Sequence, residues 1–177
     1  MITQIVNVVV TASVNQTIDL SELGNIKNLR YNPDVYGGHV AYFKDKNMQG
    51  RVSIFASGKM ISVGTNSEQQ AFDELDKTVN YLVDIGFIKP VKLNPKVRNL
   101  VVTANFGASI NLEGLALASN IIYEPEQFPA AILHLQEPIK ASVLIFTSGK
   151  TVLAGLKGSK QIEPTVKALQ HFIETHQ

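Results

Sequence analysis

A nine-residue segment occurs twice in this chain, and its duplication constrains the fold more than any other feature. Residues 51–59 read RVSIFASGK, and residues 142–150 read SVLIFTSGK. Three further motifs recur in the same order, at residues 7–12 and 99–104, 18–20 and 110–112, and 31–36 and 123–128. Self-similarity at a fixed period indicates a repeat architecture. The chain is therefore a tandem duplication, and we predict two units, residues 1–90 and 91–177.

The spacing between matching motifs falls from 92 to 91 residues within the copies. This difference predicts one extra residue in the first copy, within residues 44–50, where a loop is expected.

Each copy has the pattern of several strands followed by one long helix. Strands are expected over residues 4–13, 39–43, up to 55, and 60–64, and over 97–106, 131–135, 142–146 and 151–155. Short helices are expected over residues 19–26 and 111–119. The first long helix begins at Ser67, which forms a capping box with Gln70, and ends near Gly86. The second runs from about 160 to 175.

Composition indicates a globular, intracellular protein. Hydrophobic residues make up 45% of the chain, charged residues make up 18%, and cysteine is absent. No apolar run approaches the roughly 18 residues that cross a bilayer, and the N-terminus lacks the features of a signal peptide. The four histidines show no metal-ligand spacing, and no phosphate loop or catalytic motif is present. We therefore expect neither an enzyme, a cofactor nor a metal site.

Both faces of the predicted strands are apolar, although a helix can cover only one face. The residues expected on the uncovered face are Val9, Phe55, Val101, Leu144, Phe146 and Val152. An exposed apolar patch of this kind usually marks a binding site. A second buried layer or a dimer interface is the alternative. The net charge of +1 argues against a protein that binds nucleic acid mainly by neutralising phosphates.

Together, the motifs N-x-V-x-T, Y-[NE]-P-x-x-[FY] and I-F-x-S-G-K resemble those of the TATA-box-binding protein family. The resemblance covers about residues 3–175, and YEPEQFP at residues 123–129 is especially characteristic. It implies an α+β fold, a saddle made of a ten-stranded curved antiparallel sheet with four helices on its convex side. The family is a well-known example of minor-groove binding, in which phenylalanines wedge between base steps of A·T-rich DNA and kink it. The short N-terminus favours an archaeal member, acting in the cytoplasm at the nucleoid; a eukaryotic one would be nuclear.

The resemblance also assigns DNA-contacting residues. The wedge positions fall on Tyr36 and Phe55 and on Phe128, which precedes Pro129, and Phe146. Asn7 and Asn99 match asparagines that reach the A N3 and T O2 acceptors. The other positions rest on base edges or lie near phosphates: Val9, Ile61, Val63, Val101, Leu144, Val152, Ala154, Ser57, Lys59, Ser148, Lys150 and Lys157. Ordinary core packing is the alternative for the wedge residues, and a simple turn is the alternative for both Ser-Gly-Lys motifs.

Several family positions are altered, and most changes remove a DNA contact. Hydroxyl, cationic or apolar side chains expected by resemblance are replaced at Val63, Ala154, Tyr42, His134, Asn66 and Ser53. We therefore expect weaker and less salt-sensitive DNA binding, with the two halves contributing unequally.

The resemblance implies three partners: double-stranded A·T-rich promoter DNA, a transcription factor B-type protein and RNA polymerase. Glu124 and Glu126 match the acidic positions that contact the B-type factor. No membrane partner is expected, and a homodimer could hide the apolar face when DNA is absent. The leading hypothesis is a general transcription initiation factor that binds and bends TATA-box DNA. The alternative is a divergent paralogue that acts mainly as a protein-interaction module, with weak or partner-dependent DNA binding.

Overall fold

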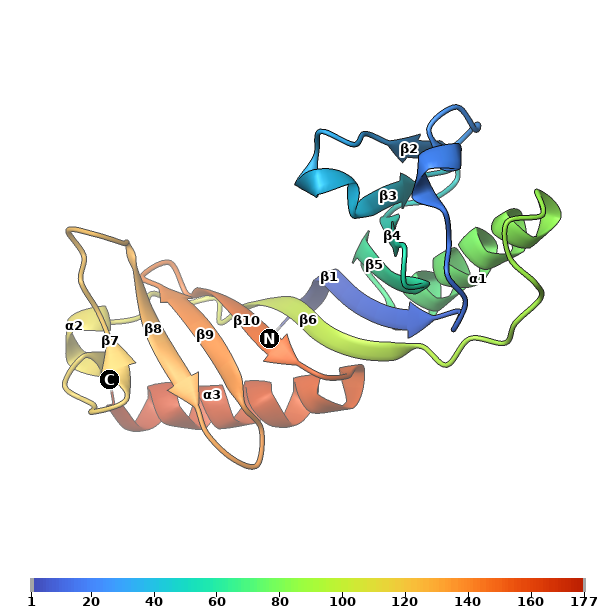
Figure 1. Cartoon of the computed structure of the whole chain (residues 1–177). Helices are drawn as coiled ribbons and strands as arrows, with labels where there is room; N and C mark the ends of the chain where they lie inside the picture. Colours follow the sequence, from blue (N-terminus) through green and yellow to red (C-terminus); the bar gives the residue numbers. More distant parts are fainter. Residues whose placement is uncertain (1, 177) are drawn as a thin grey trace. The chain divides into compact units, whose positions relative to one another are not determined.

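A computed structural model describes residues 2–176, which contain ten strands, three α-helices and three 3-10 helices (Figure 1). Contacts divide these residues into two compact units, and each is described by itself below. The first unit is residues 7–98, and the second is residues 2–6 together with 99–176. The boundary predicted from the duplication lies between residues 90 and 91. The boundaries between the contact-defined units lie between residues 6 and 7 and between residues 98 and 99. Within the second unit, the Thr103 hydroxyl donates to the Gln4 carbonyl at 3.4 Å.

The first unit is an antiparallel sheet with one long helix. Its strand order is β2-β3-β4-β5-β1. The strands are β1 (Ile2–Ser13), β2 (Leu29–Tyr31), β3 (Val40–Phe43), β4 (Arg51–Phe55) and β5 (Lys59–Thr65). Helix α1 (Glu68–Asp84) packs on β4 and β5. The predicted cap is confirmed, because the Ser67 side chain accepts a hydrogen bond from the Gln70 amide at 3.2 Å.

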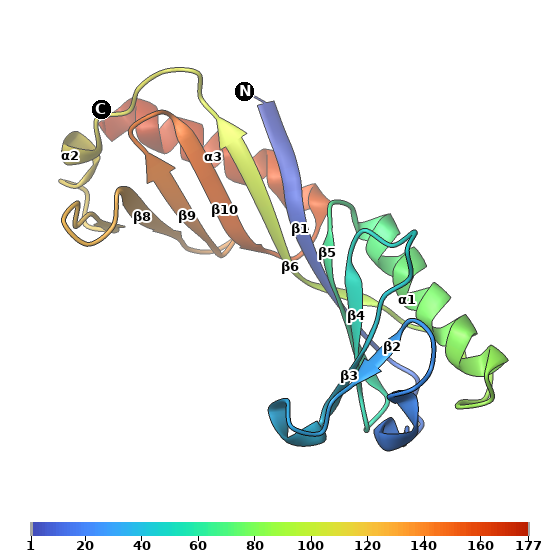
Figure 2. The same cartoon turned by 90° about the horizontal axis from the view of Figure 1, so that it is seen from above.

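The second unit repeats this plan. Its strand order is β6-β10-β9-β8-β7. The strands are β6 (Lys96–Asn105), β7 (Ile121–Ile122), β8 (Ala130–Leu135), β9 (Ala141–Phe146) and β10 (Lys150–Leu156). Helix α3 (Ile162–His176) runs along one side of β8, β9 and β10 (Figures 1 and 2). Its apolar stripe, Val166, Leu169 and Ile173, is buried.

The described residues contain three α-helices, one fewer than the resemblance implied. The expected helix over residues 19–26 is instead a single 3-10 turn, η1 (Leu20–Leu23), held by two buried leucines and by Asp19 as N-cap. Its counterpart, α2 (Leu112–Leu115), is also only one turn long. Segments this short gain little from helix propagation, so the buried leucines decide their conformation. Strands β2 and β7 are too short to show an alternating pattern and were not predicted from it.

The sheet register corrects the predicted position of the length difference between the copies. Val40 pairs with Phe55 in the first unit, whereas Ala130 pairs with Phe146 in the second. The two phenylalanines occupy the same motif position, so Val40 matches Ala130. The first copy therefore carries two extra residues, 37 and 38, before β3. The segment from Ala130 to Phe146 is in turn one residue longer than the segment from Val40 to Phe55. The prediction of a single extra residue after β3 is wrong.

Within residues 2–176, no helix combines the length and apolar character needed to cross a membrane.

Candidate nucleic-acid interface

Each unit has one sheet face that its long helix does not cover, which we call the open face. In β1, Val8 and Val10 are fully buried, whereas the intervening Val9 is half-buried on the other face. The same alternation runs along β4, β5, β6 and β9. All six residues expected on an uncovered apolar face are half-buried: Val9, Phe55, Val101, Leu144, Phe146 and Val152. The open faces therefore carry apolar side chains that contact solvent.

The two open faces differ in polarity. In the second unit, Leu144 pairs with Ile132 on one side and with Val152 on the other, which gives an apolar row across three strands. In the first unit, the matching row places Ser53 between Tyr42 and Ile61. The first open face therefore presents two hydroxyl groups where the second presents only hydrocarbon.

Asn7 and Asn99 lie on the open faces beside a break in the strand register. The Asn7 Oδ1 atom accepts a hydrogen bond from the Gly64 amide at 2.9 Å, and Asn99 Oδ1 accepts from the Gly155 amide at 2.8 Å. Because a backbone N–H can only donate, the oxygen of each side-chain amide must face the glycine. The NH₂ group of each asparagine is thereby left as a fixed pair of donors.

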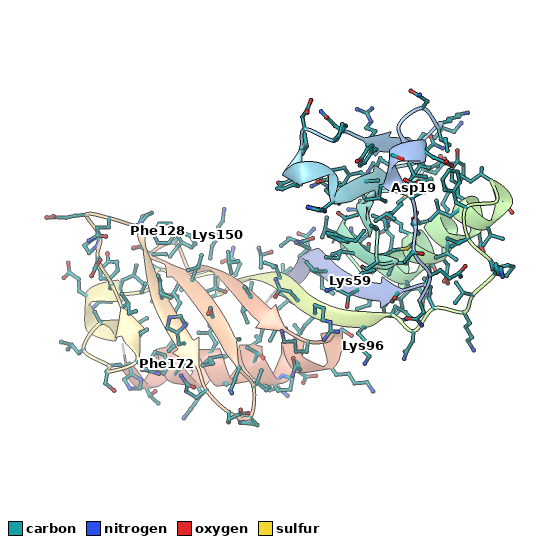
Figure 3. All side chains as sticks on the ribbon, in the orientation of Figure 1. Asp19, Lys59, Lys96, Phe128, Lys150 and Phe172 are labelled. Atoms are coloured by element: carbon teal, nitrogen blue, oxygen red, sulfur yellow. The ribbon has the colours of Figure 1, made fainter. Side chains whose placement is uncertain are left out.

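The predicted aromatic pair comes together in the second unit. The rings of Phe128 and Phe146 lie 6.3 Å apart at 63°, and Phe128 is 41% exposed. The exposed Pro129 follows, just before β8. Figure 3 shows Phe128 on the opposite side of the unit from Phe172, which lies on α3. An exposed aromatic edge-to-face pair is thus displayed away from the helix.

The first unit does not repeat this pair among the described residues. Tyr36 is 74% exposed and has a φ of 51°, and the two extra residues, 37 and 38, follow it with positive φ values. The ring contacts within residues 2–176 include no contact between Tyr36 and Phe55. The extra turn, η2 (Tyr36–Gly38), therefore separates Tyr36 from the position that Phe128 takes.

The remaining predicted contact residues lie at the ends of the open-face strands. Ile61, Val63 and Ala154 are half-buried within β5 and β10. Exposed polar residues lie in the turns after β4 and β9, at the starts of β5 and β10, and just after the ends of β5 and β10: Ser57, Ser148, Lys59, Lys150, Asn66 and Lys157. The Lys157 backbone amide is held by the Gln161 side chain at 2.6 Å.

The register also changes the assignment of the altered arginine positions. Tyr42 pairs with Ser53, and its counterpart in the second unit is Ile132, not His134. His134 lies two residues further along its strand, which makes Lys44 its counterpart in the first unit. Tyr42 and His134 are therefore not equivalent. At the position that matches His134, the first unit has a cation, Lys44.

Further cations lie beside Lys44 that the motif comparison missed. The Arg51 guanidinium lies 4.8 Å from the centre of the Tyr42 ring, a cation–π contact. Arg51, Arg30 and Lys44 line a cavity of about 730 Å³ between β2 and β5. The positions in the second unit that match Arg51 and Arg30 are the neutral Ser142 and Ile122, so these two arginines are particular to the first unit.

Three carboxyl groups have lowered pKa values, and none of them lies on an open face. The pKa of Asp19 is lowered by hydrogen bonds from Ser21. The ammonium groups of Lys77 and Lys167 lower the pKa values of Asp45 and Glu163, which they contact at 2.7 and 2.6 Å. The open faces therefore present neutral and cationic groups. In the described part of the chain, no group of three histidine or carboxylate side chains is placed to hold a metal ion.

Glu124 and Glu126 lie in the exposed connection between β7 and β8, and neither forms an ion pair within residues 2–176. The Glu124 carbonyl accepts hydrogen bonds from the amides of Gln127 and Phe128, both at 2.9 Å, which fixes the backbone of this loop.

Comparison with known proteins relates this architecture to one family. The family described as "Transcription factor TFIID (or TATA-binding protein, TBP)" matches residues 2–85 and 94–176. A TATA-box-binding protein of Methanocaldococcus jannaschii is 38% identical over 97% of this chain and 92% of its own length. One from Cenarchaeum symbiosum is 36% identical over 90% and 87%. The solved structure of Methanococcus jannaschii TBP superposes with a TM-score of 0.87 at 33% identity, covering 98% of each chain. The predicted fold class is confirmed by this likeness.

Proposed function

The chain belongs to the TATA-box-binding protein family, and on this premise we propose that it binds A·T-rich promoter DNA through the minor groove and bends it. Membership gives the chain the role of a general transcription factor, in a family of DNA-binding proteins rather than enzymes. We further propose that it recruits a transcription factor B-type protein and RNA polymerase, acting in the cytoplasm at the nucleoid. Without DNA, a homodimer through the apolar open faces is the proposed resting form.

The fixed amides of Asn7 and Asn99 carry the DNA-binding proposal. In the minor groove, A·T pairs show only acceptors, A N3 and T O2. Each asparagine already uses its oxygen on a glycine amide, so only its NH₂ donors remain for a ligand. The A·T minor groove is lined with hydrogen-bond acceptors, which match the outward NH₂ donors of the two asparagines. The apolar residues around each asparagine can displace water from this groove.

The half-buried aliphatic residues around each asparagine supply the rest of the contact surface. Val9, Val101 and Val152 would rest on base edges and exclude water, while Lys59 and Lys150 would lie near the backbone. Phe128 and Phe146 would enter a base step together. Unstacking a step costs a few kcal/mol, which the additional contacts of the bent duplex offset.

The alternative function, a protein-interaction module with weak or partner-dependent DNA binding, is favoured by the first unit alone. Its aromatic residues are separated by the extra turn, and Ser53 makes its open face more polar. The apolar row and aromatic pair of the second unit favour the first proposal, which we therefore place first.

The Asn99→Asp variant tests the DNA-binding proposal. Aspartate keeps the acceptor for the Gly155 amide, so the fold is preserved, but both donors are lost and a negative charge faces the groove. We expect affinity for a TATA duplex to fall by at least about tenfold, since one well-made base contact is worth about 1–3 kcal/mol. Fluorescence anisotropy with end-labelled duplexes measures this change.

The matched control is Asn111→Asp. Asn111 caps α2 by accepting from the Gly114 amide at 3.1 Å, and aspartate is an equally good cap. This variant introduces the same charge into the same unit away from the open face, and we expect nearly unchanged affinity. Equal losses in both variants, or the absence of any preference for TATA over a G·C-only duplex, would contradict the proposal.

Charge reversal at Glu124 and Glu126 tests the recruitment proposal. We expect the Glu124→Lys/Glu126→Lys variant to bind the TATA duplex at least as tightly as the parent, because two negative charges near DNA are removed. Supershift by the B-type factor in a gel should weaken by at least about tenfold, since like charges then face each other. The control, Glu113→Lys/Glu174→Lys, changes exposed acids on α2 and α3. An equal supershift in all three proteins would argue against this contact.

A further inference from the structure

Four cationic side chains surround one cavity of the first unit. Lys59, Lys92, Lys96 and Arg98 line a space of about 500 Å³ at the end of β1. Lys92 lies in the segment between α1 and β6, and Lys96 and Arg98 lie at the start of β6; the proposed function assigns no role to any of the three. Figure 3 labels Lys59 and Lys96, which come from different elements beside this end of β1. Segments far apart in sequence thus bring positive charge to one place.

No carboxylate lines this cavity. The other lining residues are neutral: Thr11, Ala12, Ser13, Asn15, Ser57 and Asn94. Within residues 2–176, Lys59, Lys92 and Lys96 form no ion pair. Arg98 is oriented by its Nε–H group, which donates to the Thr11 hydroxyl at 2.8 Å. Concentrating these three lysines beside Arg98 costs folding free energy by mutual repulsion, and an anionic ligand would lower that cost.

The second unit has a cavity in the matching place, but its lining differs. About 550 Å³ lies beside the end of β6, lined by a single cation, Lys150, and by apolar groups such as Ile2 and Phe146. The cationic group is therefore not a consequence of the duplicated fold. Lys96 and Arg98 of β6 match the neutral Gln4 and Val6 of β1, and Lys92 lies in the connecting segment, which occurs only once in the chain.

The position of the cavity indicates which anion it binds. Thr11 and Ser13 lie on the open face of β1, and Ser13 pairs with Lys59 of β5. A duplex resting on this open face would carry its sugar-phosphate backbone past the edge where the four cations lie. The lysine ammonium binds phosphate as a compact charge and needs no fixed geometry.

We propose that Lys92 and Lys96, together with Lys59 and Arg98, form a phosphate-binding site that holds the DNA backbone at the edge of the first open face. This inference rests on the proposed function. The site fixes position and adds salt-dependent affinity without reading sequence. A chain of net charge +1 thereby obtains phosphate contacts by local clustering, which offsets the altered positions elsewhere.

The Lys92→Gln/Lys96→Gln variant tests this site through the salt dependence of binding. Each lost phosphate contact lowers the slope of log K against log[salt] by about 0.9. From 50 to 200 mM salt, the variant should therefore lose about tenfold less affinity than the parent, on a TATA duplex and on a G·C-only duplex alike. Bending of the TATA duplex, read by energy transfer between end labels, should persist.

The matched control is Lys27→Gln/Lys89→Gln. Both lysines are exposed, lie outside the cavity, and interact through backbone atoms only, with Tyr81 and Gln16 respectively. This variant has the same net charge, and its slope should stay close to that of the parent. Thermal unfolding followed by circular dichroism verifies that both variants fold.

The outcomes separate this inference from the proposed function. If the parent bends TATA DNA but the Lys92→Gln/Lys96→Gln variant has the same salt slope as the parent, the site is overturned and the proposed function stands. If the parent shows neither TATA preference nor bending, but the Lys92→Gln/Lys96→Gln variant has a lower salt slope than the parent on both duplexes, the site is supported and the proposed function is overturned. A defect that appears only when the B-type factor is present would show that the cations bind an acidic protein segment, which also overturns the site.

Discussion

The Phe128→Ala/Phe146→Ala variant should no longer bend a TATA duplex, and its affinity should fall by about a hundredfold or more. The two rings form an exposed edge-to-face pair on the side of the unit away from α3. Removing a side chain that stacks on a base typically costs about 1–3 kcal/mol, so the loss of two is large. Energy transfer between duplex ends measures the bend, and anisotropy measures the affinity.

Two variants show whether this loss is specific. Tyr36→Ala/Phe55→Ala removes the corresponding aromatics of the first unit, where the extra turn separates them, and we expect a clearly smaller effect. Phe172→Ala removes an aromatic ring that stacks on His176 of α3, and it should leave bending intact. Bending that survives the loss of Phe128 and Phe146 would refute the wedge assignment. An equal loss in the first-unit variant would refute the asymmetry between the units.

Much of the fold could be predicted because local and repeated signals agreed. The N-cap at Ser67, the alternation in β1 and the apolar stripe of α3 each appear in the structure as the sequence indicates. The position of the length difference could not be predicted. Two extra residues before β3 and one extra residue between Ala130 and Phe146 leave a net difference of one, and motif spacing shows only the net value.

The same limit applies to the candidate site. Tyr36 matches Phe128 by counting from the preceding proline, yet the backbone that follows decides whether the ring meets its partner. Tyr42 and His134 appeared equivalent by spacing, but strand pairing makes Lys44 the counterpart of His134. Lys92 has no counterpart in the other copy and Lys96 matches the neutral Gln4, so comparison between the copies could not draw attention to them.

The Gly149→Ala variant should destabilise the second unit more than Gly107→Ala does. Gly149 has a φ of 80°, where a side chain costs roughly 1–2 kcal/mol. An added Cβ would also overlap the carbonyl oxygen of Ala108, a backbone atom that cannot rotate away. We expect unfolding free energy to fall by about 3–4 kcal/mol, at the upper end for point substitutions. Thermal unfolding followed by circular dichroism should show a midpoint about 10 °C lower.

Gly107→Ala separates the steric overlap from the backbone strain. Gly107 lies in the same unit with a similar φ of 75°, but an added Cβ would meet nothing within 4 Å. Its cost should therefore be only the backbone strain, roughly 1–2 kcal/mol. If the two variants were equally destabilised, overlap with Ala108 could not be the cause. The Gly149 turn joins Phe146 to Lys150, so the close approach of Ala108 would also hold the wedge residue and its neighbouring cation in place for the duplex.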